Sequence, residues 1–360
     1  MEDKQQFNND GMPTMPIEEG TAVPLHDFEP PRRRRLPWTK LAIFLIAIGV
    51  AVWGAGFVAS GGRGTGGLYF SLADGFMAAT IGSNEASGQF VPVENAHEIT
   101  EIIVITSAIS VVVEPANRGT GYGVQFINVD PVDMTFSNGV LTINTTSIER
   151  GFQIDVSFRG RREIRVRLPD QFEHVFVSSS SGSIRVIDTN AHYFSLTSRS
   201  GSIHMDDVNV GNTLIANTIS GSIRFDDVSG DQFIVASTSG SIRGEELRFM
   251  LGEFETVSGS IDLGDVRWSN FSARSTSGSI RITEAVIDPA GDNTQLQSTS
   301  GTINLRVDGR PSDFSYTART TTGSLNIDGS RVSGRNAEGG TGNHVISLQS
   351  TSGSVRLSFD

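Results

Sequence analysis

Basic side chains recur at one position of a short repeated string. The string reads STSGSIR at 237–243 and again at 275–281, with near copies at 298–304 and 350–356. Three positions after the glycine of the string or its looser copies, the chain carries these basic residues: Arg185, His204, Arg224, Arg243, Arg281 and Arg356. A guanidinium group is planar and donates in a fork that matches phosphate and carboxylate oxygens. The row therefore predicts a surface stripe that binds an acidic polymer or anionic lipid headgroups.

A second interpretation of this row is a solvated face without a ligand. Asp262, Asn304 and Asn326 interrupt the row at the equivalent position. Exposed arginines on a sheet also pair readily with neighbouring carboxylates, and such pairs contribute little by themselves. Both interpretations stay open on the sequence alone.

Other residue patterns that carry chemistry are weak in this sequence. The chain has no Cys, and its six His form no HExxH pair. The pairs Asp206–Asp207 and Asp226–Asp227 lack the ligand spacing of calcium-binding β-rolls, so turn formation explains them better. No nucleophile elbow, phosphate-binding loop or dinucleotide fingerprint occurs. We expect no enzyme activity, no cofactor and no metal, and the net charge of −12 argues against a nucleic-acid partner.

The glycines of the string set a period along the chain. They are Gly182, Gly201, Gly221, Gly240, Gly259, Gly278, Gly301, Gly323 and Gly353. Up to Gly278 the interval is 19 or 20 residues, and it lengthens afterwards. Such a unit is too short for a strand, a helix and a returning strand, and no helical period lies between the glycines. The period predicts an all-β fold, a single-stranded parallel β-solenoid with coils of about 19 residues.

The residues around each glycine predict which side chains point inward. Mostly apolar residues precede the glycine by seven positions and apolar residues precede it by five, and Ser or Thr precedes it by three and by one. Apolar residues follow it by two and mostly by four, which reverses the alternation. A strand alternates its faces with period two, so we expect a corner at the glycine, where its freedom of backbone angle permits the bend. This register points the Ser and Thr at both positions inward and the basic row outward.

The last coils depart from the regular interval. The segment 328–344 reads as a projecting loop, and the chain stops at Asp360, directly after a final strand with no evident cap. An uncovered solenoid end exposes unpaired strand edges. We therefore expect self-association through the solenoid ends.

Four segments are predicted along the chain. Residues 1–31 are acidic and form a disordered cytoplasmic tail, and residues 61–97 form a Gly-rich juxtamembrane linker. Between them, 32–60 contains four consecutive arginines and an uncharged apolar run at 41–60, which is long enough for one transmembrane helix. The arginines place the N-terminus in the cytoplasm, and the extracytoplasmic β-solenoid occupies 98–360. A cleaved signal peptide is the competing interpretation of the apolar run.

From about residue 98 the sequence resembles a bacterial family of candidate adhesins built from β-strand repeats, a domain of unknown function. The resemblance rests on the serial (T/S)SG(S/T)(I/L/V) units, on NGVLTI at 138–143 and on IRVRLP at 164–169. It implies a parallel β-helix-like domain on a bacterial membrane or envelope protein, and it supplies no catalytic residues.

These observations predict a non-enzymatic, single-pass cell-envelope protein at the cell membrane, an adhesin, surface scaffold or ligand-binding solenoid. An alternative is envelope-stress sensing, with signalling through the cytoplasmic tail. A polysaccharide-active β-helix enzyme is a third alternative, for which the sequence nominates no paired carboxylates.

Overall fold

The computed structural model describes residues 65–71, 75–80, 89–116, 121–129, 133–145, 154–156, 161–169, 171–288 and 291–360. The predicted tail 1–31 and the predicted transmembrane segment 32–60 lie outside these residues. Within the described ranges, no helix has the length and apolar character needed to cross a membrane.

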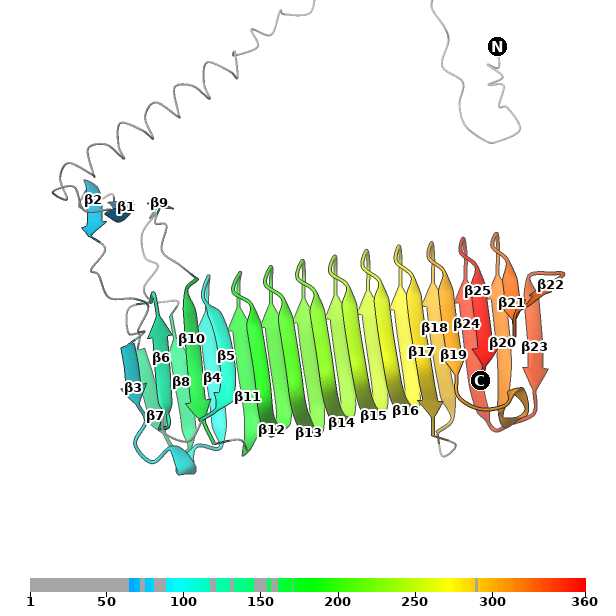
Figure 1. Cartoon of the computed structure of the whole chain (residues 1–360), viewed down its shortest axis with the longest axis horizontal. Coiled ribbons are helices and arrows are strands. Elements are labelled where there is room, and N and C mark those ends of the chain that lie inside the picture. The colour runs from blue at the N-terminus through cyan, green and yellow to red at the C-terminus, as the bar shows by residue number, and fades with distance from the viewer. Residues whose placement is uncertain are drawn as a thin grey trace, which may run out of the picture. The chain divides into compact units, whose positions relative to one another are not determined.

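The body of the protein is a stack of parallel β-coils (Figure 1). Its strands are β11 (Gln171–Ser179), β12 (Ile184–Ser198), β13 (Ile203–Thr218), β14 (Ile223–Ser237), β15 (Ile242–Thr256), β16 (Ile261–Ser275), β17 (Ile280–Ile287), β18 (Asn293–Ser298) and β19 (Ile303–Val307). Equivalent residues of successive coils pair in register, as in the column Ile203, Ile223, Ile242 and Ile261. The predicted all-β solenoid with coils of about 19 residues is confirmed.

Each coil has three sides, which the burial pattern of β15 shows. Buried and exposed residues alternate within three runs, 242–244 on the first side, 247–249 on the second and 252–256 on the third, and each run begins and ends with a buried residue. Exposed pairs separate these runs at 245–246, 250–251 and 257–258. An exposed pair breaks the period-two alternation, so each pair marks a corner at which the chain turns to the next side.

The corner at the repeated string differs from the prediction in two respects. The residue three before the glycine is buried, as at Ser237, but the residue one before it, Ser239, is exposed in this and every other coil. The prediction that both hydroxyl positions point inward is therefore wrong for the nearer one. In this coil the two exposed residues Thr238 and Ser239 lie between the buried Ser237 and the buried Gly240, where the prediction had a single outward residue between two inward ones.

The reason for glycine at this corner is also different from the predicted one. None of the repeated glycines has a positive φ angle. Instead, a Cβ on Gly240 would collide with the carbonyl oxygen of Gly221 in the preceding coil, and the same collision recurs along the column. Glycine is required because neighbouring backbones approach closely, a use of the missing side chain that does not involve unusual angles.

The corner between the first and second sides carries the unusual backbone angles. Six residues there adopt left-handed φ values of 43 to 56°: Asp188, Asp207, Asp227, Glu246, Asp265 and Glu284. Asp and Asn tolerate this region better than most residues. The recurring Asp207 and Asp227 thus serve turns, in agreement with the interpretation favoured from the sequence.

The N-terminal end of the stack is irregular. It contains β3 (Gln89–Pro92), β4 (Glu101–Thr106), β5 (Ser110–Pro115), β6 (Gly123–Ile127), β7 (Asp133–Ser137), β8 (Val140–Asn144), β10 (Glu163–Leu168) and a 3₁₀ turn at Ala96–Glu98. The coil of β4 and β5 lies between β8 and β10 on one side and β11 and β12 on the other. Antiparallel strands β3, β6 and β7 cover the outer coil.

Strands also occur inside the predicted linker 61–97. β1 (Thr65–Ser71) pairs antiparallel with β2 (Gly75–Thr80) and with β9 (Ile154–Val156). β3 pairs with β6, and Ala96 is buried in the core. The folded unit with the solenoid therefore begins at residue 89 rather than 98.

The C-terminal end corrects two further predictions. It contains β20 (Phe314–Thr320), β21 (Leu325–Ile327), β22 (Ser330–Val332), β23 (Asn336–Gly340), β24 (His344–Ser350), β25 (Val355–Phe359) and a 3₁₀ turn at Pro311–Asp313. The segment 328–344 is not a free loop, because β22 and β23 pair antiparallel with β21 and β20. The final coil, β24 and β25, lies between the coil of β18 and β19 and the coil of β20 and β21 (Figure 1).

The last strand of the sequence is therefore an interior strand. β25 pairs with β19 on one edge and β21 on the other, so the expected bare edge after Gly353 does not exist. The premise for self-association through that end is wrong. Short antiparallel strands stand at the described ends instead, among them β3 with Pro92 and β23 with Gly339 and Gly340, and short edge strands of this kind are a common protection of sheet edges.

Side chains of the inward runs form one continuous core. Phe225, Phe233, Phe249, Phe254, Trp268 and Phe271 pack against one another near its middle. Because each coil contributes only a few apolar residues, its stability depends on contact with the coils above and below.

Candidate functional site

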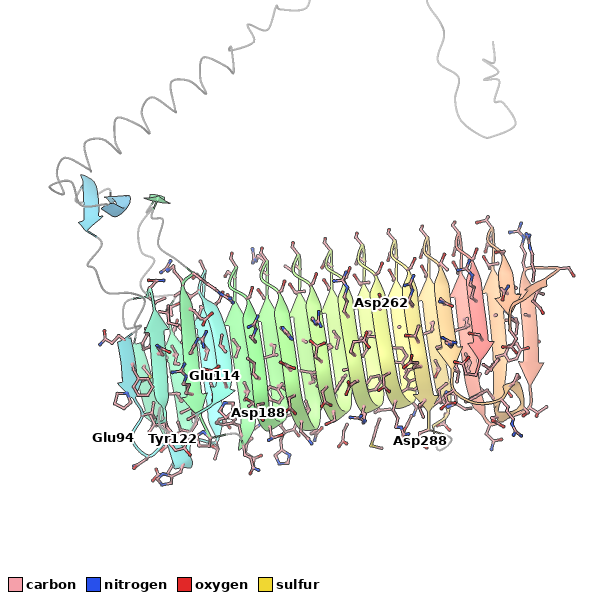
Figure 2. All side chains as sticks on the ribbon, viewed as in Figure 1. Glu94, Glu114, Tyr122, Asp188, Asp262 and Asp288 are labelled. Carbon is pink, nitrogen blue, oxygen red and sulfur yellow. The ribbon has the colours of Figure 1, made fainter. Side chains whose placement is uncertain are left out.

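The basic row lies on the outer surface of the first side. Arg185, Arg224, Arg243, Arg281 and Arg356 are exposed and His204 is half-buried, which confirms the predicted outward direction. The strand register aligns them in the order Arg185, His204, Arg224, Arg243, Asp262, Arg281, Asn304, Arg356 and Asn326. Figure 2 shows the outward side chains of the stacked coils and labels Asp262, which interrupts the row.

One end of this row lies in a groove. The groove encloses about 430 Å³, and its polar lining consists of Arg161, Ser183, Arg185, Ser202, His204, Ser222, Arg224 and Arg243. No carboxylate belongs to this lining. We call it the basic groove. It brings together four of the six predicted residues, whereas Arg281 and Arg356 lie beyond Asp262.

The centre of the basic groove is neutralised by a carboxylate on its border. Arg224 donates from Nε to Asp226 Oδ2 at 2.7 Å and from Nη2 to Oδ1 at 2.9 Å. His204 Nε2 lies 3.0 Å from the same Oδ2. The hydrogen bond from Arg224, and then its charge, hold the pKa of Asp226 below its ordinary value, and the His204 hydrogen bond adds to this. For these two basic residues the interpretation of paired surface charges is correct.

The flanks of the basic groove differ from its centre. Within the described part of the chain, no ion pair joins the guanidinium groups of Arg185 or Arg243 to a carboxylate. Arg161 forms one with Glu163 at 3.2 Å. Arg185 and Arg243 therefore keep their donors available on either side of the neutralised centre, which is the arrangement that an anionic ligand requires.

Two features of the basic groove were not found from the sequence. The serines directly after the glycines, Ser183, Ser202 and Ser222, line its floor beside the arginines. The sequence does show that the residue after the glycine is Ser or Thr in every copy of the string. The repeat alone does not show which surface of the coil this residue faces. Arg161 precedes the repeats, so no periodicity could align it with Arg185.

An acidic row borders the basic row two residues further along each strand. Asp206, Asp226 and Glu245 pair in register on neighbouring coils. Burial, followed by repulsion from Asp262, Asp226 and Glu284, raises the pKa of Glu245 above its ordinary value. This row limits how far an anion can extend across the first side. No group of three His, Asp or Glu suited to a metal ion occurs among the described residues.

Three solved structures are similar to this chain. A crystal structure of a candidate lipid-binding protein from Parabacteroides distasonis is 17% identical, covers 77% of this chain and 98% of its own, with a TM-score of 0.46. A candidate adhesin from Bacteroides fragilis is 11% identical, with 77% and 98% covered and a TM-score of 0.40. A candidate cell adhesion protein from Clostridium sporogenes is 10% identical, with 77% and 100% covered and a TM-score of 0.26. None of these likenesses is strong enough to carry an argument about function.

Family membership rests on a separate comparison. No curated protein matches the chain. The family model described as Toastrack DUF4097 matches residues 99–358, which include all nine repeated glycines and the basic groove. The resemblance to a repeat family of unknown function is thereby confirmed, and the chain belongs to the Toastrack DUF4097 family.

Proposed function

We propose that this protein is a non-enzymatic binding protein of the bacterial cell envelope, which holds an acidic polymer in its basic groove. The observation that carries the proposal is the pair of unpaired guanidinium groups, Arg185 and Arg243, in a groove without carboxylates in its lining. The serine hydroxyls on the groove floor add donors between the arginines. A rigid stack of coils suits such a role, because its surface is ordered before the ligand arrives and little entropy is lost on binding.

The rest of the chain fits this proposal. The apolar run 41–60 and the arginines before it would anchor the protein in the membrane with the solenoid outside the cytoplasm. An anchored solenoid would then function as an adhesin or surface scaffold, since its binding surface would be presented outside the cytoplasm. Signalling through the acidic tail remains a prediction from the sequence.

A binding assay tests the proposal on the full chain, kept in detergent because of the apolar run. Fluorescently labelled polyphosphate serves as the probe, and neutral dextran of similar length serves as the control. We expect saturable binding of polyphosphate that weakens as NaCl is raised, because salt screens exposed charges. Equal binding of both polymers, or no binding of polyphosphate at low salt, would contradict the proposal.

A further inference from the structure

The third side of the coils presents an exposed apolar surface that the basic groove does not explain. Phe176 points outward from this side, and Tyr193 and Ile219 lie at the two corners that bound it. These three residues are 38%, 40% and 48% exposed. Ile215 and Ile234 lie half-buried between them and are direct neighbours on β13 and β14. We call this surface the apolar face. Ser195, Thr213 and Gln232 lie among these residues, and no charged residue does. An uncharged surface with several large exposed apolar side chains commonly marks a contact surface.

Arg199 and Glu255 lie the same number of coils from the centre of the apolar face. Arg199 follows β12, and Glu255 lies in β15, so the two residues are three coils apart. The midpoint between them falls between β13 and β14, which is where Ile215 and Ile234 lie side by side. Tyr193 and Leu251 are related in the same way, because they lie on β12 and β15.

We infer that the apolar face binds the same face of a second copy of this chain, with the two solenoids antiparallel. A two-fold axis parallel to the strands, running between β13 and β14, turns one third side onto the other. Ile215 then faces Ile234 of the second copy, and Tyr193 faces Leu251 of the second copy. Arg199 faces Val257 of the second copy. Glu255 of the second copy lies two positions along the coil from Val257, within reach of the long Arg199 side chain.

The two-fold axis supports the antiparallel pairing of the two copies, because each contact between them, such as Ile215 with Ile234, occurs twice in the interface. Further from the axis, the contacts also bring no two groups of like charge together. His174 faces Asn270 of the second copy, and Phe176 faces Ser272 of the second copy. A parallel arrangement of the two solenoids would place Glu253 opposite Glu255 of the second copy. Opposed carboxylates are unfavourable when water is excluded, so the antiparallel arrangement is preferred.

The available area is sufficient for a stable dimer. From β4 to β18 the third side is about 38 Å long and about 23 Å wide, from the spacing of parallel strands and the rise per residue. This corresponds to roughly 900 Å² per copy, and a standard interface uses about 800 Å² per partner. Interdigitation of side chains is feasible, because the stacked coils form a nearly straight row (Figure 1).

Cysteine cross-linking tests this inference sharply, since the chain contains no Cys. The double variant Y193C/L251C of the full chain in detergent is treated with a short bis-maleimide and separated on a denaturing gel. Within one copy the two sites are about 14 Å apart along the stack, but in the antiparallel dimer they face across about 10 Å between sheets. We expect a covalent dimer from the double variant and from a mixture of the two single variants.

The single variants Y193C and L251C provide matched controls. Each cysteine lies three coils from its own symmetry mate, so each variant alone should remain monomeric on the gel. Both side chains are exposed, so thermal unfolding should be unchanged in all three variants. A double variant that cross-links no more than the single variants would overturn the inference.

A charge exchange gives an independent readout by analytical ultracentrifugation. R199E and E255R should each weaken the dimer severalfold, because each places like charges together at both symmetric contacts. The combined variant R199E/E255R should regain most of the wild-type association. A monomeric wild-type chain at high concentration, or a combined variant no better than the single ones, would count against the antiparallel pairing.

Discussion

The hydroxyl group of Ser198 joins two neighbouring coils through the carbonyl oxygen of Gly182. It donates to that oxygen at 3.2 Å and accepts from the backbone N–H of Gly201 at 2.9 Å. The same pair of bonds recurs at Thr218, Ser237, Thr256, Ser275, Ser298, Thr320 and Ser350. The most regular part of the repeated string is therefore a buried hydrogen-bond relay along the stack.

Ser237→Ala tests the relay in the middle of the stack. The change leaves the N–H of Gly240 and the carbonyl oxygen of Gly221 without the side-chain partner that both have. We expect a loss of about 1–3 kcal/mol in the free energy of unfolding, measured by chemical denaturation. Ser239→Ala changes an exposed hydroxyl two residues away and should be nearly neutral. Ser237→Thr should also be tolerated, because Thr256 makes the same bonds in the next coil. Equal losses for both alanine variants would contradict the relay.

Gly240→Val tests the close approach of the backbones. The new side chain would collide with the carbonyl oxygen of Gly221, and this backbone atom cannot move without separating the coils. We expect a destabilisation of about 3 kcal/mol or more. Arg243→Gln, on an exposed neighbour, should leave the midpoint of denaturation unchanged. If Gly240→Val were as harmless as Arg243→Gln, the glycine column would have no structural role.

Stability should depend on pH through His344, which is 2% exposed. Its Nδ1 lies 3.0 Å from the carbonyl oxygen of Gly291, so Nδ1 carries the proton and Nε2 accepts from the Thr294 hydroxyl at 2.9 Å. Trp268 Nε1 donates to the same hydroxyl oxygen at 2.7 Å. Burial lowers the pKa of His344 below its ordinary value of 6.5, against a smaller opposing effect of the Gly291 hydrogen bond.

The sign of this dependence follows from proton uptake. As pH falls, the unfolded chain binds a proton at His344 before the folded chain does, so the folded state loses stability. The contribution is complete above about pH 6.5 and declines as pH falls toward the folded-state pKa. Melting temperatures measured from pH 7.5 to 5 should decrease, and the decrease should be smaller in His344→Gln. A wild-type melting temperature that rises over this range would refute the assignment.

Glu245→Gln should stabilise the protein slightly. The raised pKa of Glu245 shows that its charged form is disfavoured by burial and by the carboxylates of Asp262, Asp226 and Glu284. The amide removes this charge with little change in shape. Because the side chain lies near the surface, the gain should be a few tenths of a kcal/mol, roughly the scale of exposed charge interactions. The gain should shrink at high salt. A loss of stability at low salt would show that the acidic row is held by favourable contacts.

Several features of the fold could be predicted because they repeat. The interval between glycines identified the coil, and the apolar residues two and four positions after each glycine identified the inward face. The direction of Arg185 and Arg243 followed from that register. These inferences need only the local period and the cost of burying unpaired charge.

Other features depend on contacts between coils, which the sequence does not show. The number of residues in a corner decides whether Ser239 points inward or outward, and alternation alone cannot supply that number. The order of coils in space places Gly353 beside Gly301 rather than after Gly323, although the repeat is equally compatible with a simple succession. The pairing of His204 with Asp226 also depends on which residues stack on neighbouring coils.

The most direct test of the proposed function compares two double variants with the same change in charge. R185Q/R243Q removes the unpaired guanidinium groups of the basic groove, and R248Q/R267Q removes two arginines from the second side. Each lost charge-assisted hydrogen bond weakens binding by about 1.5–3 kcal/mol, so R185Q/R243Q should bind polyphosphate at least about tenfold more weakly than the wild type. R248Q/R267Q should retain the wild-type affinity. If both variants lose affinity equally, the ligand responds to net charge alone and the basic groove is not its binding site.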